Sequence, residues 1–332
     1  MRSLLFLPLL ASCALNADLG VESAAAPAPR VARPAGEGVC ERVPQATAAS
    51  YRHSRNRFYR KLGEPRFRGI DLIASEDDEM QMLGGKLAYT AADKDVGDED
   101  VEVFACIGGD WQFVRPARTG ADGRFQIALG GGDRLPVGMR DLYAHVPGHG
   151  GGVRFLAYVA PRGTTAIASD VDGTLTESEE AILNTVLFGD DIAHQPNAPR
   201  VLAAARRPVI YLTSRGDQYT EVTRRWLEVH GFPRGPLRLA RAAITQPGPK
   251  TVAFKTDVLR ALRIPLAAGI GNRASDITAY ANVGLSPRQI LINLPEFTRE
   301  VTADLAAGRA TAFDDYRELP ALLDRGTLPP VE

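Results

Sequence analysis

A pair of aspartates directly after a buried strand places the strongest constraint on how this chain can fold. The apolar run at residues 165–169 predicts the strand, and Asp170, Asp172, Gly173 and Thr174 follow it. Two carboxylates at such a position are costly to remove from water unless a cation or a proton compensates them. We therefore expect this loop to bind a cation together with an anionic ligand.

Beyond residue 160, strand-like and helix-like segments alternate along the chain. This alternation predicts a parallel sheet with helices on both faces, in which ligands bind beyond the carboxyl ends of the strands. The polar signatures of this region fall at those ends. The expected strands are 165–169, 208–213, 236–239, 267–270 and 289–293, and the expected helices are 218–230, 254–262 and 275–283.

Residues 69–160 show a different pattern, with short strands separated by clusters of Gly, Asp and Pro. This pattern predicts a small antiparallel β-sandwich. The predicted fold class is therefore α/β, with a doubly wound parallel-sheet domain at 161–332 that follows a small β-sandwich domain at 69–160. The expected sandwich strands are 70–74, 85–91, 101–106, 111–114, 124–129, 142–145 and 153–159.

The first residues are typical of an export signal. A positive charge at Arg2 precedes an apolar run at residues 4–10, and small residues then lead to Cys13. The approach to Cys13 resembles the lipobox of bacterial lipoproteins, in which this cysteine is lipidated; an ordinary signal peptide with an incidental cysteine is the alternative. With Ala14 next, the resemblance implies a signal at residues 1–13 and an exported, membrane-anchored lipoprotein in the outer membrane, facing the periplasm.

Residues 14–68 are expected to connect this signal to the folded domains. Ala, Pro and Gly dominate as far as about residue 38, which predicts a tether that buries no core. The segment 48–69 is basic and aromatic and could lie on an anionic membrane surface. We favour a linker helix with a solvated basic face and with aromatic side chains packed on the next domain. Cys40 and Cys106 could form a disulfide in an oxidising compartment or remain separate thiols, and both alternatives stay open.

Composition excludes several classes of protein. The net charge of −1 gives no global field for nucleic acid, and 45% hydrophobic with 24% charged residues is ordinary for a globular protein. No internal apolar run approaches the ~18 residues that span a bilayer. His145 and His149 lie four apart around Gly and Pro, a poor mount for a metal, so we expect none there. No protein partner is implied.

Four signatures in order predict the chemistry, beginning with the aspartate pair. Asp170 is expected to be the nucleophile towards phosphorus, and Asp172 to protonate the leaving oxygen and then deprotonate water. Gly173 and Thr174 are expected to bind phosphate oxygens, because a side chain at the glycine would obstruct their approach. The loop therefore predicts phosphoryl transfer through an aspartyl-phosphate.

The other three signatures supply partners for that pair. Thr213 and Ser214 follow the second strand and would bind the phosphoryl group, and Lys255 would offset its charge and lower the pKa of the nucleophile. Asn272 and Asp276 would complete an oxygen-rich shell for Mg²⁺. The predicted site residues are catalytic Asp170, Asp172, Thr213 and Lys255; phosphate-binding Gly173, Thr174, Thr213, Ser214 and Lys255; and metal-binding Asp170, Asp172, Asn272 and Asp276.

The four signatures resemble those of the haloacid dehalogenase superfamily of phosphatases. More narrowly, residues about 165–294 are similar to the catalytic domain of lipins, which also join a β-sandwich to this domain. Two departures stand out: lipins are largely intracellular, and they have Ser-Ala where this chain has Thr213-Ser214. The narrower resemblance rests on Ser169 to Thr176, Tyr211 to Arg215, Thr223-Arg224, Trp226-Leu227, Gly235 to Leu237, Phe254-Lys255, Gly271 to Arg273, Asp276, Ala279-Tyr280 and Val283-Gly284.

The resemblance implies a Mg²⁺-dependent phosphomonoesterase that acts on a phospholipid, with phosphatidate as the favoured substrate. An exported phosphatase for soluble phosphomonoesters is one alternative. A phosphatidate-binding module without turnover is another, because some phosphatidylinositol transfer proteins resemble lipins in carrying a related domain. Retention of both Asp170 and Asp172 favours the enzyme, since a binding module needs no acid/base aspartate.

Overall fold

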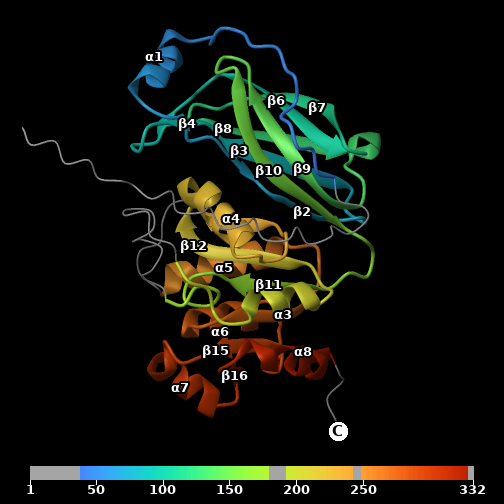
Figure 1. Cartoon of the computed structure of the whole chain (residues 1–332), viewed down its shortest axis with the longest axis vertical. Coiled ribbons are helices and arrows are strands. Elements are labelled where there is room, and N and C mark those ends of the chain that lie inside the picture. The colour runs from blue at the N-terminus through green and yellow to red at the C-terminus, as the bar shows by residue number, and fades with distance from the viewer. Residues whose placement is uncertain (1–37, 179–191, 242–247, 328–332) are drawn as a thin grey trace, which may run out of the picture. The chain divides into compact units, whose positions relative to one another are not determined.

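The structure is a computed structural model that describes residues 38–178, 192–241 and 248–327, and it holds a β-sandwich followed by an α/β domain (Figure 1). The predicted fold class is confirmed. One sandwich sheet has the order β1-β3-β8 and the other β2-β10-β9-β6-β7. The strands are β1 Arg68–Ile70, β2 Leu72–Ser75, β3 Met80–Lys86, β4 Ala88–Tyr89, β5 Lys94–Asp95, β6 Asp100–Ile107, β7 Asp110–Arg118, β8 Arg124–Gly130, β9 Gly138–Val146 and β10 Gly151–Ala160, with a 3-10 turn, η1, at Gly131–Asp133.

The sandwich forms because its strands alternate apolar and polar residues. In a strand, successive side chains point to opposite faces, so every second residue can enter one core. Strand β8 buries Phe125, Ile127 and Leu129, while the residues between them face solvent. Strands β6 and β9 contribute to the same cluster from the other sheet, which closes the core. Several strands are longer than predicted, and β7 runs from 110 to 118 rather than 111 to 114.

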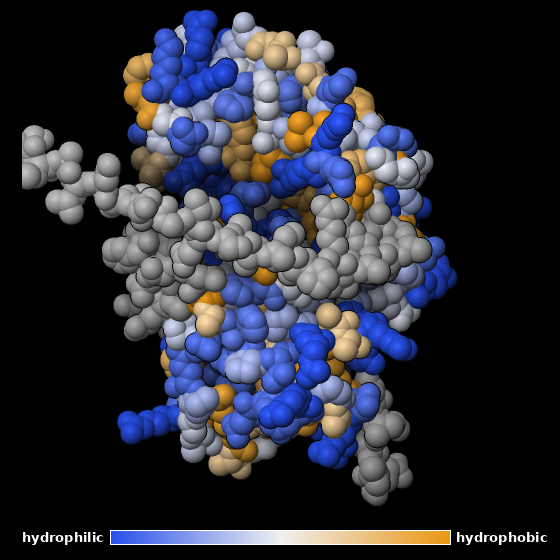
Figure 2. Space-filling view, in the orientation of Figure 1, coloured by the Kyte–Doolittle hydropathy of each residue, from blue (hydrophilic) through white to orange (hydrophobic). Residues whose placement is uncertain are grey.

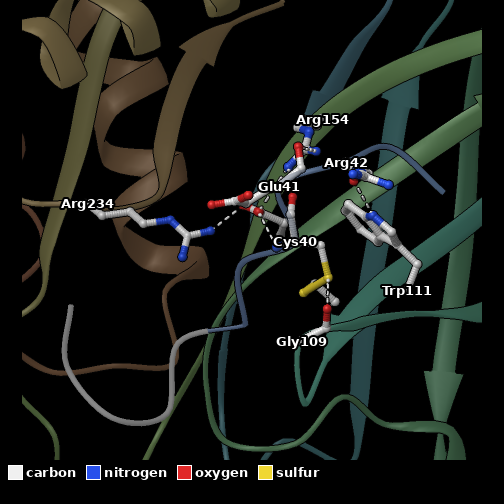
Figure 3. Close-up of a disulfide and its surroundings, with 9 residues drawn as sticks. Cys40, Glu41, Arg42, Gly109, Trp111, Arg154 and Arg234 are labelled. Atoms are coloured by element: carbon white, nitrogen blue, oxygen red, sulfur yellow. Dashed lines mark hydrogen bonds and ion pairs between the residues drawn. A yellow bond between two sulfur atoms is a disulfide. The ribbon is translucent and has the colours of Figure 1, made fainter. Parts of the chain in front are cut away.

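The chain that precedes the first sandwich strand is fastened to the sandwich. Cys40 and Cys106 form a disulfide with Cα atoms 5.8 Å apart, which answers the question that the sequence left open. Arg154 donates to the carbonyls of Cys40 and Glu41 from one side of this link (Figure 3). Gly38 also forms a bridge to β9. Residues 38–53 therefore lie against the sandwich, and they begin where the Ala-, Pro- and Gly-rich composition of the predicted tether ends.

A helix forms in the basic segment, as the preferred interpretation predicted. Helix α1 spans Ser54–Leu62 and presents its arginine and lysine side chains to solvent. The aromatic residues on either side, Tyr51 and Phe67, are buried in the sandwich core, whereas Phe58 is 56% exposed. Packing of the aromatic side chains is therefore confirmed in part. Among the described residues, no helix is long and apolar enough to cross a bilayer.

The α/β domain is built on a six-stranded parallel sheet in the order β13-β12-β11-β14-β15-β16. Neighbouring residues on one strand enter different cores: Ile167 packs with α3, α4 and α8, and Ala168 with α5, α6 and α7. Helices thus cover both faces. The strands are β11 Ala166–Asp170, β12 Val209–Gly216, β13 Leu237–Ala240, β14 Leu266–Gly271, β15 Ile290–Asn293 and β16 Thr311–Phe313; the helices are α3 Ala198–Ala204, α4 Thr220–Val229, α5 Pro249–Ala261, α6 Ala274–Ala281, α7 Thr298–Ala306 and α8 Leu319–Thr327, with 3-10 turns η2 Asp217–Tyr219 and η3 Tyr316–Glu318.

All five predicted strands of this domain are present, four of them within one residue of their expected bounds, while β12 ends at Gly216, three residues beyond the predicted end. The sequence did not predict β16, α3, α7 or α8. Strand β16 has only three residues and α3 only seven, so little periodic pattern marks these two. The missed strand extends the sheet at the edge beyond β15 and does not change the central strands that carry the site.

A buried aspartate joins the sandwich to the α/β domain. The Asp71 carboxylate accepts from the backbone N–H of Leu156 in β10 (2.8 Å) and of Leu237 in β13 (2.7 Å), and it pairs with Arg224 of α4. An apolar cluster beside it contains Leu156 from the sandwich and Ile210 from β12. Because Asp71 is satisfied from both sides, its burial favours one packing of the two domains.

The apolar surface is distributed unevenly between these domains. Figure 2 shows more apolar surface over the sandwich than over the α/β domain on the face in view. The described large apolar side chains with high exposure follow the same division, since all but Val229 precede residue 160. The remainder are Val43, Phe58, Leu62, Ile70, Met80, Met82, Phe113 and Val137.

Candidate active site

The aspartate pair lies at the carboxyl edge of the parallel sheet. Asp170 is the last residue of β11, and β11 is flanked by β12 and β14, whose carboxyl ends carry Thr213 and Asn272. Because all three strands are parallel, their carboxyl ends meet at one edge. The structure therefore brings the first, second and fourth signatures together there.

Lys255 reaches this edge from helix α5. Its Nζ lies 2.6 Å from Asp170 Oδ1 and 2.5 Å from Asp276 Oδ1, and all three side chains are at least 94% buried. Two carboxylates share one ammonium, so the cluster carries an excess negative charge. Lys255 is therefore enclosed by the site.

The electrostatics of this cluster follow from its burial. Burial raises the pKa of Asp170 to about 7, although the Lys255 ammonium opposes the rise. Burial alone would lower the pKa of Lys255, but Asp170 and Asp276 together raise it above its ordinary value. Lys255 therefore stays protonated. Its single positive charge balances only one of the two carboxylates, and the free-energy cost of burying the other would be lowered by a further cation.

Asp172 has different partners, one of which the sequence did not reveal. Thr213 donates its hydroxyl to Asp172 Oδ2 at 2.6 Å, and Arg215 donates through Nε to both carboxylate oxygens at 2.8 and 3.1 Å. The Arg215 Nη1 also donates to Thr223 on α4 at 3.0 Å. Asp172 is 19% exposed, so it is oriented and still reachable from solvent. The arginine directly after Thr-Ser in the second signature was the available signal for this role.

The loop between the two aspartates and Thr176 is held by its own hydrogen bonds. Gly173 has φ +66°, and its N–H donates to the Thr176 hydroxyl at 2.8 Å. The hydroxyl of Thr174 lies 3.2 Å from Asp170 Oδ2. A Cβ at Gly173 would come within 2.4 Å of side-chain atoms of Asn272 and Glu296, so glycine is required by space as well as by φ.

Two residues outside the four signatures hold the loop at residues 170–176 through its backbone. The carbonyl of Thr174 accepts from the Tyr316 hydroxyl at 2.8 Å and from Asn293 Nδ2 at 3.3 Å. Both side chains are buried, and they come from η3 and from the end of β15. No local sequence pattern marks either residue, because their partner is a backbone atom more than a hundred positions away.

The donor set fits a hard divalent cation. Asn272 is 1% exposed, and neither its amide oxygen nor its nitrogen has a hydrogen-bond partner among the described residues. Buried polar atoms of this kind ordinarily find a ligand. Together with the excess charge around Lys255, Asn272 makes an oxygen-rich site of the type that suits Mg²⁺. Among the described residues, no three His, Cys, Asp or Glu side chains are grouped so as to hold a metal ion by themselves.

Asp276 has a structural task in addition. Its Oδ2 accepts from the backbone N–H groups of Asn272 and Arg273, both at 3.1 Å, while its Oδ1 faces Lys255. These bonds shape the turn that carries Asn272. Ser214 lies between Thr213 and Arg215 with its hydroxyl buried and unpartnered among the described residues. Cys13, the predicted lipidation residue, lies outside the described residues.

The two histidines of the sandwich have different packing partners. His149 Nδ1 lies 2.7 Å from the Tyr89 hydroxyl, and its ring packs on Phe67. His145 is buried on β9, where its ring stacks on Tyr143. Each ring therefore has its own packing partners.

Comparison with known proteins connects this edge of the sheet to a family. Residues 167–293 match the family model described as PITM 1-3, LNS2 domain. Residues 167–293 are therefore LNS2-like. The matched stretch contains Asp170, Asp172, Thr213, Lys255 and Asp276.

Curated relatives of this chain fall into two groups. The human membrane-associated phosphatidylinositol transfer protein 3 is 25% identical over 259 residues, covering 74% of this chain and 26% of its own length. Mouse phosphatidate phosphatase LPIN3 is 25% identical over 185 residues (50% and 21%), and nuclear elongation and deformation protein 1 of fission yeast, Schizosaccharomyces pombe, is 31% identical over 149 residues (37% and 22%). The first match exceeds the α/β domain in length, so it extends into the sandwich. The chain spans about a quarter or less of the length of these relatives.

Proposed function

We propose that this protein is a Mg²⁺-dependent phosphatase that hydrolyses a phosphomonoester through an aspartyl-phosphate on Asp170. The observation that carries the proposal is the arrangement of two carboxylates with different surroundings. Asp170 is buried against Lys255, and Asp172 is partly exposed and oriented by Thr213 and Arg215. Carboxylates whose environments differ in this way suit the separate tasks of nucleophile and proton carrier.

The residues divide the reaction between them. An oxygen of Asp170 attacks phosphorus, and the bond from phosphorus to the ester oxygen breaks as Asp172 gives that oxygen a proton. Asp172 then removes a proton from water, which attacks the aspartyl-phosphate and releases inorganic phosphate and the free Asp170 carboxylate. Lys255 and the Thr213 hydroxyl offset the charge on the phosphoryl oxygens during both steps.

Asp170, Asp172, Asn272 and Asp276 would hold Mg²⁺, with Asn272 offering an oxygen that has no other described partner. When bound, the cation would neutralise the carboxylates and draw the substrate phosphate towards Asp170. The excess negative charge around Lys255 supports this assignment.

Phosphatidate is the favoured substrate, with diacylglycerol as the product at a membrane surface. The relatives support a phospholipid, because one is named a phosphatidate phosphatase and another a phosphatidylinositol transfer protein. The second name also supports the non-catalytic alternative, a module that binds phosphatidate. Asp172 and its two side-chain partners favour the enzyme, since binding alone requires no oriented proton carrier.

The test is phosphate release from phosphatidate in mixed micelles, beside a panel of soluble phosphomonoesters, with Asp170→Asn as the matched inactive variant. We expect release that requires Mg²⁺, stops with EDTA and is lost in Asp170→Asn. Equal rates on the lipid and the soluble panel would remove the lipid preference and leave the phosphatase. Tight binding of phosphatidate vesicles by wild type with no release from any substrate would establish the binding module instead.

We propose further that the protein is exported and anchored through lipidated Cys13, in the outer membrane facing the periplasm. The Cys40–Cys106 disulfide supports export, because such links persist mainly in oxidising compartments. Mass spectrometry of the mature protein tests this: an acylated N-terminal peptide beginning at Cys13 is expected, and an unmodified Cys13 would contradict it.

A further inference from the structure

The second signature is followed by a carboxylate that accepts hydrogen bonds from the sandwich. Asp217 begins η2, two residues after Arg215, and its side chain is only 10% exposed. Arg68 Nε donates to Asp217 Oδ1 at 2.7 Å, and Arg124 Nη2 donates to Oδ2 at 3.0 Å. Both arginines are on sandwich strands, so the link crosses from one domain to the other.

The two arginines belong to a row of cations across the three-stranded sheet. Arg68 on β1 pairs in register with Lys86 on β3, and Lys86 pairs with Arg124 on β8. Three adjacent cations repel one another unless carboxylates lie between them. Asp93 takes two bonds from Arg68 and one from Lys86, all at 2.7 Å. Arg124 lies at the end of the row, and Asp217 is the buried carboxylate that neutralises it.

The backbone around Arg215 needs support of this kind. Strand β12 pairs with β11 only as far as Leu212, and its register with β13 breaks between Thr213 and Gly216. Ser214 and Arg215 therefore lie in an irregular stretch between two paired residues. The ladder hydrogen bonds that fix the strand are interrupted where the side chain that orients Asp172 begins.

We infer that Asp217, held by Arg68 and Arg124 of the sandwich, is a positioning residue that fixes Arg215 and through it the Asp172 carboxylate. The inference rests on the proposed function for its catalytic consequence. The sandwich thereby sets the geometry of the Asp172 carboxylate through Asp217 and Arg215. A displacement of about 1 Å in a positioned group can cost ~100-fold in rate, so small shifts in this link matter.

Asp217→Asn tests the link, because it removes the charge and keeps the shape. We expect faster hydrogen–deuterium exchange in peptides covering residues 213–220, with no change in peptides from β14. We also expect kcat to fall by ~10-fold to ~100-fold with a smaller change in KM. Asp217→Glu should recover part of kcat. The matched control is Asp100→Asn, which breaks an exposed ion pair with Arg118 on the same sandwich and should change neither measurement.

Arg124→Gln provides a second route if Asp217→Asn folds poorly. Because Asp217→Asn already weakens the contact that Arg124→Gln removes, the double variant should lose little more activity than Asp217→Asn alone. Wild-type exchange in residues 213–220 of Asp217→Asn, or faster exchange with full kcat, would overturn the inference. If the wild-type protein releases no phosphate at all, the proposed function fails, and the exchange measurement still decides whether Asp217 fixes Arg215.

Discussion

The sandwich and the α/β domain both bury charged side chains, but they balance them differently. In the sandwich, Arg68 and Lys86 face the carboxylates of Asp93, Asp95 and Asp217, so each cation has a partner. At the edge of the parallel sheet, two carboxylates share Lys255, and Asn272 has no partner among the described residues. In the first arrangement both cations are paired without a ligand. The second carries unmet charge and unmet hydrogen bonding, which is what a site for a cation and a phosphate requires.

The largest effect on activity is expected when one of the two carboxylates that share Lys255 is removed. Asp170→Asn should lower kcat for phosphate release by at least ~10³-fold, because the nucleophile is gone. The variant should unfold at a temperature equal to or above that of wild type, since the desolvated carboxylate that burial disfavours is also gone. Thermal unfolding and phosphate release measured on one preparation check both parts. A lower melting temperature with the same loss of rate would show that the charge is needed for folding.

Removing the buried lysine of the α/β domain should cost more stability than removing a partly buried lysine of the sandwich. Lys255→Met leaves Asp170 and Asp276 buried without their partner, for which we expect a loss of ~3–5 kcal/mol in the free energy of unfolding. Urea unfolding measures it. Lys86→Met is the matched sandwich variant, and a smaller loss is expected because Asp93 keeps its two bonds from Arg68. Equal losses in both variants would contradict the comparison.

Loss of the disulfide should weaken the sandwich by an intermediate amount. The double change Cys40→Ser and Cys106→Ser opens a loop with a sequence separation of 66 and is expected to cost ~2–4 kcal/mol. At temperatures where the variant stays folded, kcat should match wild type, because neither cysteine is among the residues that bond to Asp170 or Asp172. Urea unfolding and phosphate release are the measurements, and a fall in kcat without unfolding would show that the link acts on the site.

The smallest effect concerns pH and the sandwich pairs. Side-chain hydrogen bonds from Arg68 lower the pKa of Asp93 to about 2, with Lys86 adding to them and burial opposing. A depressed folded-state pKa gives stability that is present above the ordinary pKa near 3.8 and is lost as pH falls towards 2. Asp93→Asn should therefore show a smaller loss of urea stability between pH 4 and pH 2 than wild type. Asp133→Asn, in an exposed pair with Arg115, is the control and should follow wild type.

The sequence predicted the strands that carry the site and the carboxyl edge where they end. These predictions succeeded because each depends on a local pattern: an apolar run, a following polar signature and a regular alternation. Lys255 and Asp276 were also identified by signature, and the structure places both within hydrogen-bonding distance of each other. The disulfide was left open because spacing alone cannot show that two cysteines meet.

What the sequence could not predict are contacts between distant parts of the chain. Tyr316 holds the carbonyl of Thr174, and Asp71 accepts from backbone groups of β10 and β13. Neither residue belongs to a periodic pattern, and an aspartate before a strand looks the same whether it is solvated or buried. Arg215 is part of the second signature, but only the structure shows that its guanidinium donates to Asp172.

The Cys40–Cys106 link has a mechanical consequence. A pull on the chain ahead of residue 38 first loads the bridge from Gly38 to β9 and then passes through the two sulfur atoms into β6, which lies between β9 and β7 rather than at an edge of its sheet. The force then acts on hydrogen bonds on both sides of that strand. Residues 41–67, including α1, would stay slack under such a pull, and so would the connection to the parallel sheet. We therefore expect a pull on the chain ahead of this link to leave Asp170 and Asp172 in place.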